Sequence, residues 1–457
     1  MSIQELFTEA QALSTSKLRD DIVEHLYDRS RQLCNEGISY TKSKQDTTTE
    51  KLDSIFTSPL FGFPIMITML GVLFYLTIAG ANIPSSLIAE LFGWIEGQIT
   101  TLFHAIHAPD WLHGILVLGL YRGTTWVISV MLPPMAIFFP AFALLENYGY
   151  LPRVAFNMDR LFKRVGAHGK QSLTMAMGFG CNAAAVISTR IIESPRERML
   201  AILTNNFVPC NGRWGTLIVL ASLFMAANFT GGLKSLVTTG VIVGIVLFGI
   251  IVTFFVSWAL SKTALKGIPT HYTLELPPYR KPKILDTVIR SSLTKSWSVL
   301  MRAVKVAAPA AILTWVFANI YIGDTSILMY AVNFLDPFGK MLGLDGYIMM
   351  AFILGLPANE IVLPILLMGY LSTGSLTEVD NLVDLKQIFL DHGWTWLTAL
   401  NMMLFSLLHY PCGTTLLNIY KETKSKKWTF LSFLIPTVIA ILIPFIITQA
   451  VRMFGLV

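Results

Sequence analysis

The sequence predicts an all-helical protein that crosses a membrane several times, and three observations predict it. Of the 457 residues, 54% are hydrophobic and only 14% are charged, whereas a soluble domain carries about 25% charged residues. Several stretches of about 20 residues hold almost no charge, which is long enough for a helix to cross a hydrocarbon core of roughly 30 Å. Lys and Arg gather in some of the intervening loops and are absent from others, as in multi-pass membrane proteins.

The net charge and the cysteines exclude other classes. The net charge of +6 does not indicate a nucleic-acid partner, because the basic residues lie beside apolar segments. Of the four cysteines, Cys34 lies in a polar region and the other three lie in or beside apolar segments. Their spacing indicates neither a disulfide framework nor a zinc site. The polar and acidic first residues, 2–6, are not those of a cleavable signal peptide.

The chain divides into two parts. Residues 1–55 are polar with helical periodicity, and we expect a short cytosolic helical segment there. Residues 56–457 form the expected transmembrane transport domain. Its apolar segments cover about 61–80, 114–146, 173–189, 199–225, 235–260, 298–322, 347–371, 395–419 and 429–451.

The loops give an orientation. Basic residues dominate 151–172, 261–296 and 421–427, so these loops and the N-terminus are expected in the cytoplasm. Residues 81–113 contain no Lys or Arg and 372–394 contain one, so both are expected outside. We therefore expect a multi-pass protein of the cell (cytoplasmic) membrane.

Two segments conflict with a simple count of spans. Segment 173–189 has basic sequence on both sides, and segment 347–371 has acidic sequence on both sides. Each is interrupted midway, at 178–182 and at 355–360. We expect two re-entrant hairpins that enter from opposite sides, since non-helical backbone at this depth needs protein or a watery cavity around it.

The segment after each hairpin is also broken. Proline and glycine fall inside the two following segments, at 209–212 and at 411–414, and should unwind the helix there. The chain thus repeats a hairpin and a broken helix, once over about 114–260 and once over about 298–451. Inverted repeats with discontinuous helices are typical of secondary transporters.

Few ionisable groups lie within the apolar segments, so those present are informative. Glu360 is the only charged residue between 347 and 371, and a carboxylate at this depth indicates a functional site. The alternative is that Glu360 anchors loosened hairpin backbone. Asn359 beside it offers an amide oxygen to a cation, and Asn182 holds the corresponding place in the first hairpin.

Cys181, Cys210 and Cys412 all fall at predicted breaks. Each of them is also explicable as a small hydrophobic residue, but together they indicate a binding site for a transition metal. Thiolate with carboxylate and amide oxygen suits Fe(II) better than Mg(II) or Ca(II). The expected transport pathway comprises Cys181, Asn182, Cys210, Asn211, Asn359, Glu360, Cys412 and Thr414.

Three further residues have more than one interpretation. His409 lies three residues before Cys412 and is a possible ligand or proton carrier, although a lone His on an apolar helix is often a packing residue. Arg122 and Arg213 are expected to pair internally or to reach the membrane surface. No G-x-x-x-x-G-K-[ST] loop occurs in the sequence, so we expect a transporter rather than a nucleotide-hydrolysing enzyme.

At these motifs the sequence resembles the membrane part of the bacterial ferrous iron transporter B family, over nearly all of residues 50–450. The runs that carry the resemblance are Leu60-Phe61-Gly62-Phe63-Pro64, Leu145-Glu146-Asn147-Tyr148-Gly149-Tyr150-Leu151-Pro152-Arg153, Gly178-Phe179-Gly180-Cys181-Asn182, Pro357-Ala358-Asn359-Glu360 and Pro411-Cys412-Gly413-Thr414-Thr415-Leu416.

The resemblance implies uptake of Fe(II), as substrate rather than as a permanent cofactor, through two gate repeats similar to concentrative nucleoside transporters. It implies Cys181, Cys210 and Cys412 as pathway residues. Members usually carry an N-terminal GTP-binding domain and a helical spacer, and residues 1–55 look like the end of that spacer. A separate GTPase subunit and a homo-oligomer are therefore possible partners, besides the lipid bilayer.

Two alternatives to a metal permease remain. The first is a transporter of nucleosides or another small organic solute on the same fold, which would need hydrogen-bonding side chains but no cysteines at the breaks. The second is a membrane assembly or signalling subunit, which would need neither Glu360 nor paired broken helices. The choice among Fe, Mn, Co and Zn, the energy source and the side of the C-terminus stay open.

Overall fold

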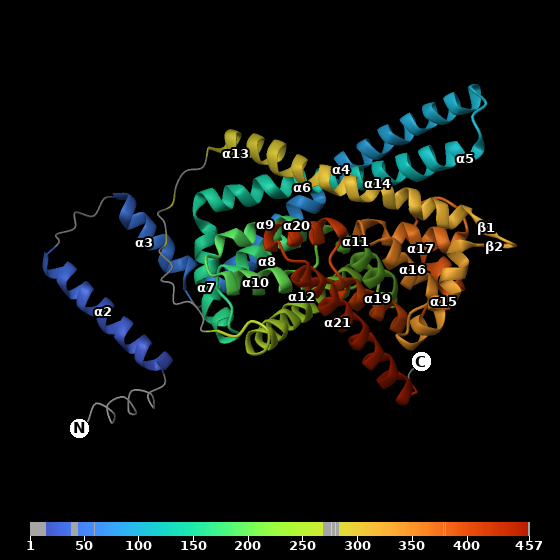
Figure 1. Ribbon diagram of the computed structural model, residues 1–457. Coiled ribbons are helices and arrows are strands. Elements are labelled where there is room, and N and C mark those ends of the chain that lie inside the picture. The colour runs from blue at the N-terminus through green and yellow to red at the C-terminus, as the bar shows by residue number, and fades with distance from the viewer. Residues whose placement is uncertain are drawn as a thin grey trace.

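The computed structural model of the protein is almost entirely helical (Figure 1). It describes residues 15–37, 44–58, 60–267, 276, 279, 283–377, 379 and 381–455. In this part of the chain the only strands are β1 (Tyr321–Ile322) and β2 (Thr325–Ser326), which form one antiparallel pair. Five helical runs are long and apolar enough to cross a membrane, or six if one bent pair is a single span. The predicted class, an all-helical multi-pass membrane protein, is confirmed.

The five long runs are continuous helices or helices joined end to end. They are α4 (Gly62–Ala105); α5 (Asp110–His113) with η1 (Gly114–Tyr121) and α6 (Arg122–Tyr148); α12 (Gly231–Lys262); α13 (Ile284–Arg290) with η5 (Ser291–Ser296) and α14 (Trp297–Asn319); and α21 (Lys426–Met453). The bent pair is α15 (Ile327–Met341) with α16 (Gly346–Leu354), whose axes differ by 111°.

The first span is longer than the sequence indicated. A helix over 61–80 followed by an outer loop was predicted, but α4 continues without a break to Ala105. At about 1.5 Å per residue this helix is roughly 66 Å long, about twice the hydrocarbon core. Its second half is held to the next run, since Arg122 Nε donates to Glu96 Oε1 at 3.0 Å and the Tyr121 hydroxyl donates to the Phe92 carbonyl at 3.1 Å. The second half of α4 and the start of the next run, with α5, form an arm that projects from the body (Figure 1).

The prolines of α6 lie inside the helix and do not end it. The helix α6 stays helical through Pro133, Pro134 and Pro140. Because Pro140 has no N–H, the Ala136 carbonyl lacks its helical donor. The hydroxyl of Ser292 in η5 donates to that carbonyl at 3.4 Å instead. A neighbouring helix thus compensates the backbone bond that the proline removes.

Between the long runs the chain forms short helices. The first set is α7 (Tyr150–Arg164), α8 (Gln171–Gly180), α9 (Asn182–Ser188), η2 (Thr189–Ile191), α10 (Pro195–Thr204), η3 (Asn205–Phe207), α11 (Asn211–Leu220) and η4 (Ala221–Met225). The second set is η6 (Asn359–Ile361), α17 (Val362–Leu371), α18 (Leu382–Asp391), α19 (Trp396–Leu408) and α20 (Gly413–Thr423). All four predicted breaks are present: between α8 and α9, before α11, between α16 and η6, and between α19 and α20.

The N-terminal part contains α2 (Thr15–Gly37) and α3 (Lys44–Phe56), and residues 1–14 and 38–43 of the expected helical segment lie outside the described residues. The end of α3 docks on α7. Arg153 Nε donates to Asp53 Oδ1 at 2.9 Å, and the Asn157 amide donates to the Phe56 carbonyl at 2.7 Å. Helix α3 is therefore attached to the helix that leads into the first hairpin.

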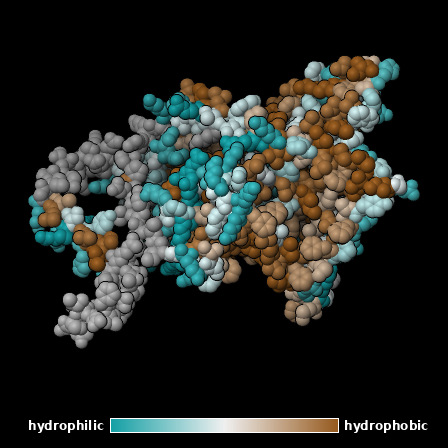
Figure 2. Space-filling model, in the orientation of Figure 1, coloured by the Kyte–Doolittle hydropathy of each residue, from teal (hydrophilic) through white to brown (hydrophobic). Residues whose placement is uncertain are grey.

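The surface divides by polarity. Figure 2 shows hydrophilic side chains gathered on the part of the body nearest the N-terminal helices and hydrophobic side chains over much of the rest. Large apolar side chains are exposed along α4 and α12, among them Tyr75 (72% exposed), Leu236 (70%) and Phe255 (65%). Such extended apolar surface is stable against lipid and is not found on soluble monomers.

Candidate functional site

The four helix breaks meet in one region of the protein. The Gly413 N–H, just after the fourth break, donates to the Leu356 carbonyl in the third break at 2.8 Å. The amide of Asn359, at the end of the third break, donates to the sulfur of Cys210 in the second at 3.8 Å. Segments that lie 57 and 149 residues apart in sequence are thus in direct contact at their breaks.

The first break joins the same region through Asn182. Asn182 begins α9 and is 3% exposed. Its Nδ2 donates to the Val208 carbonyl at 3.4 Å, and its Oδ1 accepts from Asn205 Nδ2 at 3.2 Å. The first hairpin is therefore tied to the second break by side-chain amides, and unwound backbone is satisfied inside the protein as it must be at membrane depth.

The three cysteines each precede a short helix. Cys181 stands before α9, Cys210 before α11 and Cys412 before α20. Cys181 and Cys210 are buried, and Cys412 is half-buried. A helix N-terminus carries partial positive charge, which acts in favour of a thiolate, whereas burial away from water acts against it. A bound cation would offset this cost of burial.

Glu360 lies on η6 against the backbone of α11. A Cβ built on Gly212 would lie only 2.4 Å from the Glu360 Cδ. A larger residue at position 212 would require this carboxylate to move. Sequence reasoning missed Gly212, and the available indication was a glycine two residues after Cys210 at a predicted break.

His409 ends α19 and is 1% exposed. Its Nε2 lies 3.3 Å from Asn359 Oδ1, and its Nδ1 lies 2.8 Å from the Ser406 carbonyl. Since Asn359 also contacts Cys210, the imidazole, the amide and the thiol form a chain of polar contacts. The position is compatible with both interpretations of His409, as packing residue and as pathway residue.

Asn211 and Thr414 complete the predicted set. Asn211 begins α11 and lines a small cavity together with Phe138, Gly180 and Trp214. Thr414 is 4% exposed, and its hydroxyl has no hydrogen-bond partner among the described residues. An unsatisfied buried hydroxyl is uncommon and calls for a ligand, water or ion.

The side chains do not form a closed metal site. In the part of the chain that the structure describes, no three His, Cys, Asp or Glu side chains come together in a group that could hold a metal ion. The predicted residues line one region, but a cation there would find at most a partial set of charged ligands.

Both arginines singled out from the sequence pair internally, as predicted. Arg122 contacts Glu96 and donates to the Ser375 hydroxyl at 2.8 Å. Arg213 is 1% exposed, and its guanidinium donates to backbone carbonyls at the second and fourth breaks.

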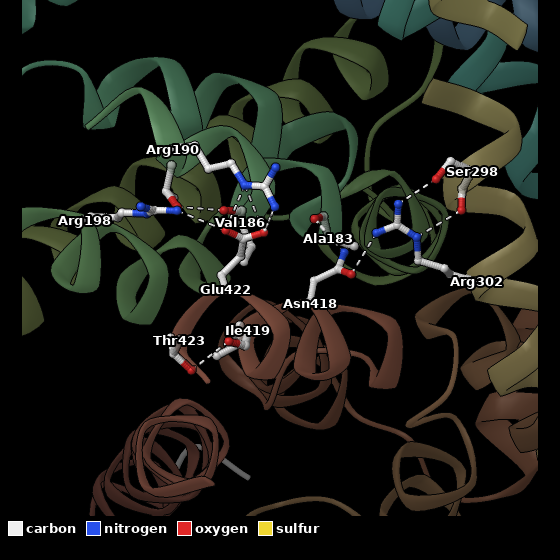
Figure 3. A network of polar contacts seen from close by, with 11 residues as sticks. Ala183, Val186, Arg190, Arg198, Ser298, Arg302, Asn418, Ile419, Glu422 and Thr423 are labelled. Carbon is white, nitrogen blue, oxygen red and sulfur yellow. Dashed lines mark hydrogen bonds and ion pairs between the residues drawn. The ribbon is translucent and has the colours of Figure 1, made fainter. Parts of the chain in front are cut away.

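An ion-pair cluster lies beside the breaks (Figure 3). Glu422, at the end of α20, accepts from Arg190 Nη2 at 2.6 Å and from Arg198 Nη2 at 3.0 Å. Although burial acts to raise the pKa of Glu422, the hydrogen bonds and charges of Arg190 and Arg198 lower it below its ordinary value. Sequence reasoning did not find this cluster, and the indication was one acid within the basic patch at 421–427.

A second set of contacts ties α20 to the first break (Figure 3). The Asn418 amide donates to the Ala183 carbonyl at 2.9 Å, and Asn418 Oδ1 accepts from Arg302 Nη1 at 2.9 Å. Ala183 is the second residue after Cys181. Helices α9, α14 and α20 are therefore fixed to one another next to the cysteines.

Comparisons with known proteins show what the chain as a whole is similar to. A family model described as Nucleoside recognition matches residues 128–224 and 300–426, and one described as Ferrous iron transport protein B C terminus matches residues 242–294. No solved structure matches the chain.

The relatives include proteins named Fe(2+) transporter FeoB. The one from Staphylococcus aureus strain MSSA476 is 28% identical over 98% of this chain and 65% of its own length. The one from Methanocaldococcus jannaschii is 28% identical over 93% of this chain and 62% of its own length. A Porphyromonas gingivalis protein named Fe(2+) transport protein A/Fe(2+) transporter FeoB fusion protein is 26% identical over 90% of this chain and 52% of its own length. The chain thus spans less than two thirds of the length of these relatives.

Proposed function

This chain belongs to the family of the membrane part of ferrous iron transport protein B, and we propose that it carries Fe(2+) across the cytoplasmic membrane. The observation that carries the proposal is the meeting of four helix breaks, which brings three cysteines and Glu360 into one membrane-embedded region. Fe(2+) is the cargo, and thiolate with carboxylate and amide oxygen is a ligand set suited to it. Cys181, Asn182, Cys210, Asn211, Asn359, Glu360, Cys412 and Thr414 line the proposed pathway, with His409 beside it.

The proposed mechanism is alternating access between two inverted repeats, as in concentrative nucleoside transporters. The matched stretches 128–224 and 300–426 support this architecture, because each contains one hairpin break and one broken helix. The unfilled ligand set supports a cycle in which the breaks converge on the ion and separate again. In this proposal the N-terminus and the basic loops face the cytoplasm.

A nucleoside or other small organic solute on the same fold is the second candidate, and the relatives named Fe(2+) transporter FeoB favour the first. Such a solute would use the buried amides of Asn182, Asn205 and Asn359. It would not need a cysteine at three of the four breaks.

The deciding experiment is anaerobic Fe(2+) uptake into proteoliposomes that contain this chain. Wild type is compared with Cys181→Ser, Cys210→Ser, Cys412→Ser and Glu360→Gln, and Cys34→Ser in α2 serves as the matched control. We expect uptake by wild type and by the control, and its loss in the other four. Nucleoside uptake without Fe(2+) uptake would refute the proposal.

Partners form part of the proposal. A separate GTPase subunit or a homo-oligomer would supply what a longer relative carries in one chain, and the fusion protein shows that family members are linked to further polypeptides. Fe(2+) uptake that appears only after addition of a GTPase would support a separate GTPase subunit. Fe(2+) uptake at full rate by the chain alone would refute the need for such a subunit.

A further inference from the structure

Arg213 satisfies the carbonyl groups that the fourth break leaves without donors. The Leu407 carbonyl of α19 would normally accept from the residue four positions later, which is Pro411 and has no N–H. Arg213 Nη1 donates to that carbonyl at 2.7 Å, and Nη2 lies 3.3 Å from the carbonyls of both His409 and Tyr410. One guanidinium therefore caps the C-terminal end of the half-helix α19.

The same guanidinium also holds the second break. Arg213 Nη1 donates to the Asn206 carbonyl at 2.8 Å, and Nη2 lies 3.2 Å from Asn206 Oδ1. Asn206 in turn donates through Nδ2 to the His409 carbonyl at 2.5 Å. The hydrogen-bond acceptors of this cation among the described residues are thus neutral oxygens, and its Nε is buried without a partner there.

A buried cation among neutral carbonyls is costly, so its position calls for a functional reason. The C-terminal end of a helix carries partial negative charge and stabilises a cation. In transporters with broken helices, unwound carbonyls and the C-terminal ends of half-helices bind the coupling Na⁺ or H⁺. Here the arginine side chain, which keeps its charge in proteins, lies where such an ion would bind.

We infer that Arg213 is a tethered internal cation that replaces a coupling ion at the broken helix α19–α20, so that transport proceeds without Na⁺. The inference deepens the proposed function and rests on it. It makes Arg213 a positioning residue, because its contacts are with the backbone of the two breaks rather than with the cargo. Its charge also acts on Glu360, which lies within electrostatic range.

The two halves differ in this respect. Arg213 stands three residues after Cys210, and the residue three positions after Cys412 is Thr415, which contacts the Cys412 sulfur at 3.2 Å. Thr415 carries no charge. The first half of the chain therefore places a fixed cation at the broken helix of the second half. The corresponding position in the second half holds no charged residue.

The test uses the full chain in proteoliposomes with Na⁺, choline or guanidinium as the bulk cation. Wild type should take up Fe(2+) equally in Na⁺ and choline. Arg213→Ala should lose roughly tenfold or more in choline, because several buried carbonyls lose their donor, and should regain part of the loss in guanidinium or Na⁺. Arg213→Lys keeps the charge, so its uptake should remain independent of Na⁺. Its uptake rate should lie between those of wild type and Arg213→Ala. Arg452→Ala is the matched control, since Arg452 donates to the Lys340 carbonyl at 2.9 Å on the exposed surface.

A second readout does not depend on iron. Detergent-solubilised Arg213→Ala should gain saturable binding of radioactive Na⁺, which wild type and Arg452→Ala lack. The inference would be overturned if wild type bound Na⁺ or needed Na⁺ for uptake. It would also be overturned if Arg213→Ala folded but neither bound Na⁺ nor regained uptake in Na⁺ or guanidinium. If Arg213→Ala fails to fold, a Na⁺ requirement in Arg213→Lys would overturn it and Na⁺-independence would support it. Absence of iron uptake by wild type would refute the proposed function alone, since Na⁺ binding still decides the role of Arg213.

Discussion

The amide of Asn359 donates a hydrogen bond to the sulfur of Cys210 at 3.8 Å. The two residues are 149 positions apart and belong to breaks in opposite halves of the chain. An amide and a thiol in contact hold each other in a buried, polar position, and separation of the two halves would break this contact. The contact therefore reports whether the breaks are together or apart.

Cysteine-to-serine exchange at the breaks should abolish Fe(2+) uptake without unfolding the protein. A hydroxyl has nearly the size of a thiol but is a poor ligand for a borderline metal. We expect Cys210→Ser to lose uptake at least as severely as Cys181→Ser and Cys412→Ser, because Asn359 orients its sulfur. Uptake is measured anaerobically, with Cys34→Ser as control. Normal uptake by all three variants would show that the thiols only pack.

Gly212→Ala should resemble Glu360→Gln. The added methyl group would lie 2.4 Å from the Glu360 Cδ and would displace the carboxylate, whereas the glutamine keeps the shape and removes the charge. Both should reduce Fe(2+) uptake roughly tenfold or more, with a larger effect on stability in Gly212→Ala because a buried contact is overpacked. Gly215→Ala on the same helix, where a Cβ meets nothing within 4 Å, is the control. Equal uptake by Gly212→Ala and the control would contradict the assigned position of Glu360.

Acid should weaken the contact between α20 and α10. The pKa of Glu422 in the folded protein lies below its ordinary value of 4.5. A lowered carboxyl pKa contributes stability that is present above the ordinary pKa and is lost as the pH falls through the lowered one. Glu422→Gln should therefore lower the melting temperature at neutral pH and flatten the loss of stability toward about pH 3.

The control for the acid effect is Glu193→Gln. Glu193 is 73% exposed and pairs with Lys170, and an exposed pair contributes little to stability. A melting temperature that falls with acid as steeply in Glu422→Gln as in wild type would show that other carboxyl groups govern the effect.

Asp53→Asn should detach the end of α3 from α7. Arg153 is 1% exposed and forms an ion pair with Asp53, and loss of one partner of a buried charged hydrogen bond costs about 1–3 kcal/mol. We expect a lower melting temperature and faster chymotrypsin cleavage after Phe56. Asp28→Asn on the exposed surface of α2 is the control, and equal cleavage rates in the two variants would contradict the proposed docking.

The helix breaks were predictable because their cause is local. Pro411 removes a backbone donor, and the glycines at 178, 180 and 355 weaken a helix wherever they stand. The cysteines and Glu360 were identifiable because polar or reactive groups are rare in apolar segments. The meeting of these positions followed only from the assumption of two similar halves, and the contacts of Asn359 and Asn182 are consistent with it.

What the sequence did not reveal depends on contacts between distant segments. The end of α4 was misplaced because its second half is polar enough to resemble a loop, yet its pairing with Arg122 and Tyr121 keeps it helical. The close approach at Gly212 involves a carboxylate 148 residues later, and three carbonyls that face the Arg213 guanidinium, those of Leu407, His409 and Tyr410, lie in the other half of the chain. No local periodicity encodes such pairs.

Fe(2+) should stabilise the protein only if the breaks can converge. The described residues do not form a group of three metal ligands, so part of the binding free energy must be spent on rearrangement. At a concentration of 100 times the apparent Kd, stabilisation reaches about 2.7 kcal/mol for a single site. We expect the melting temperature in detergent to rise with anaerobic Fe(2+), more than with Mg(2+), because Mg(2+) prefers oxygen ligands alone.

The triple variant Cys181→Ser, Cys210→Ser and Cys412→Ser should lose the response to Fe(2+), and Cys34→Ser should keep it. Asn359→Asp tests the role of the neighbouring amide. It replaces the donor to Cys210 with a second carboxylate beside Glu360. It should strengthen binding of the free ion, because another negative ligand is added, and slow its release, so the thermal shift should grow while uptake falls. A thermal shift and an uptake rate that fall together would place Asn359 among the packing residues instead.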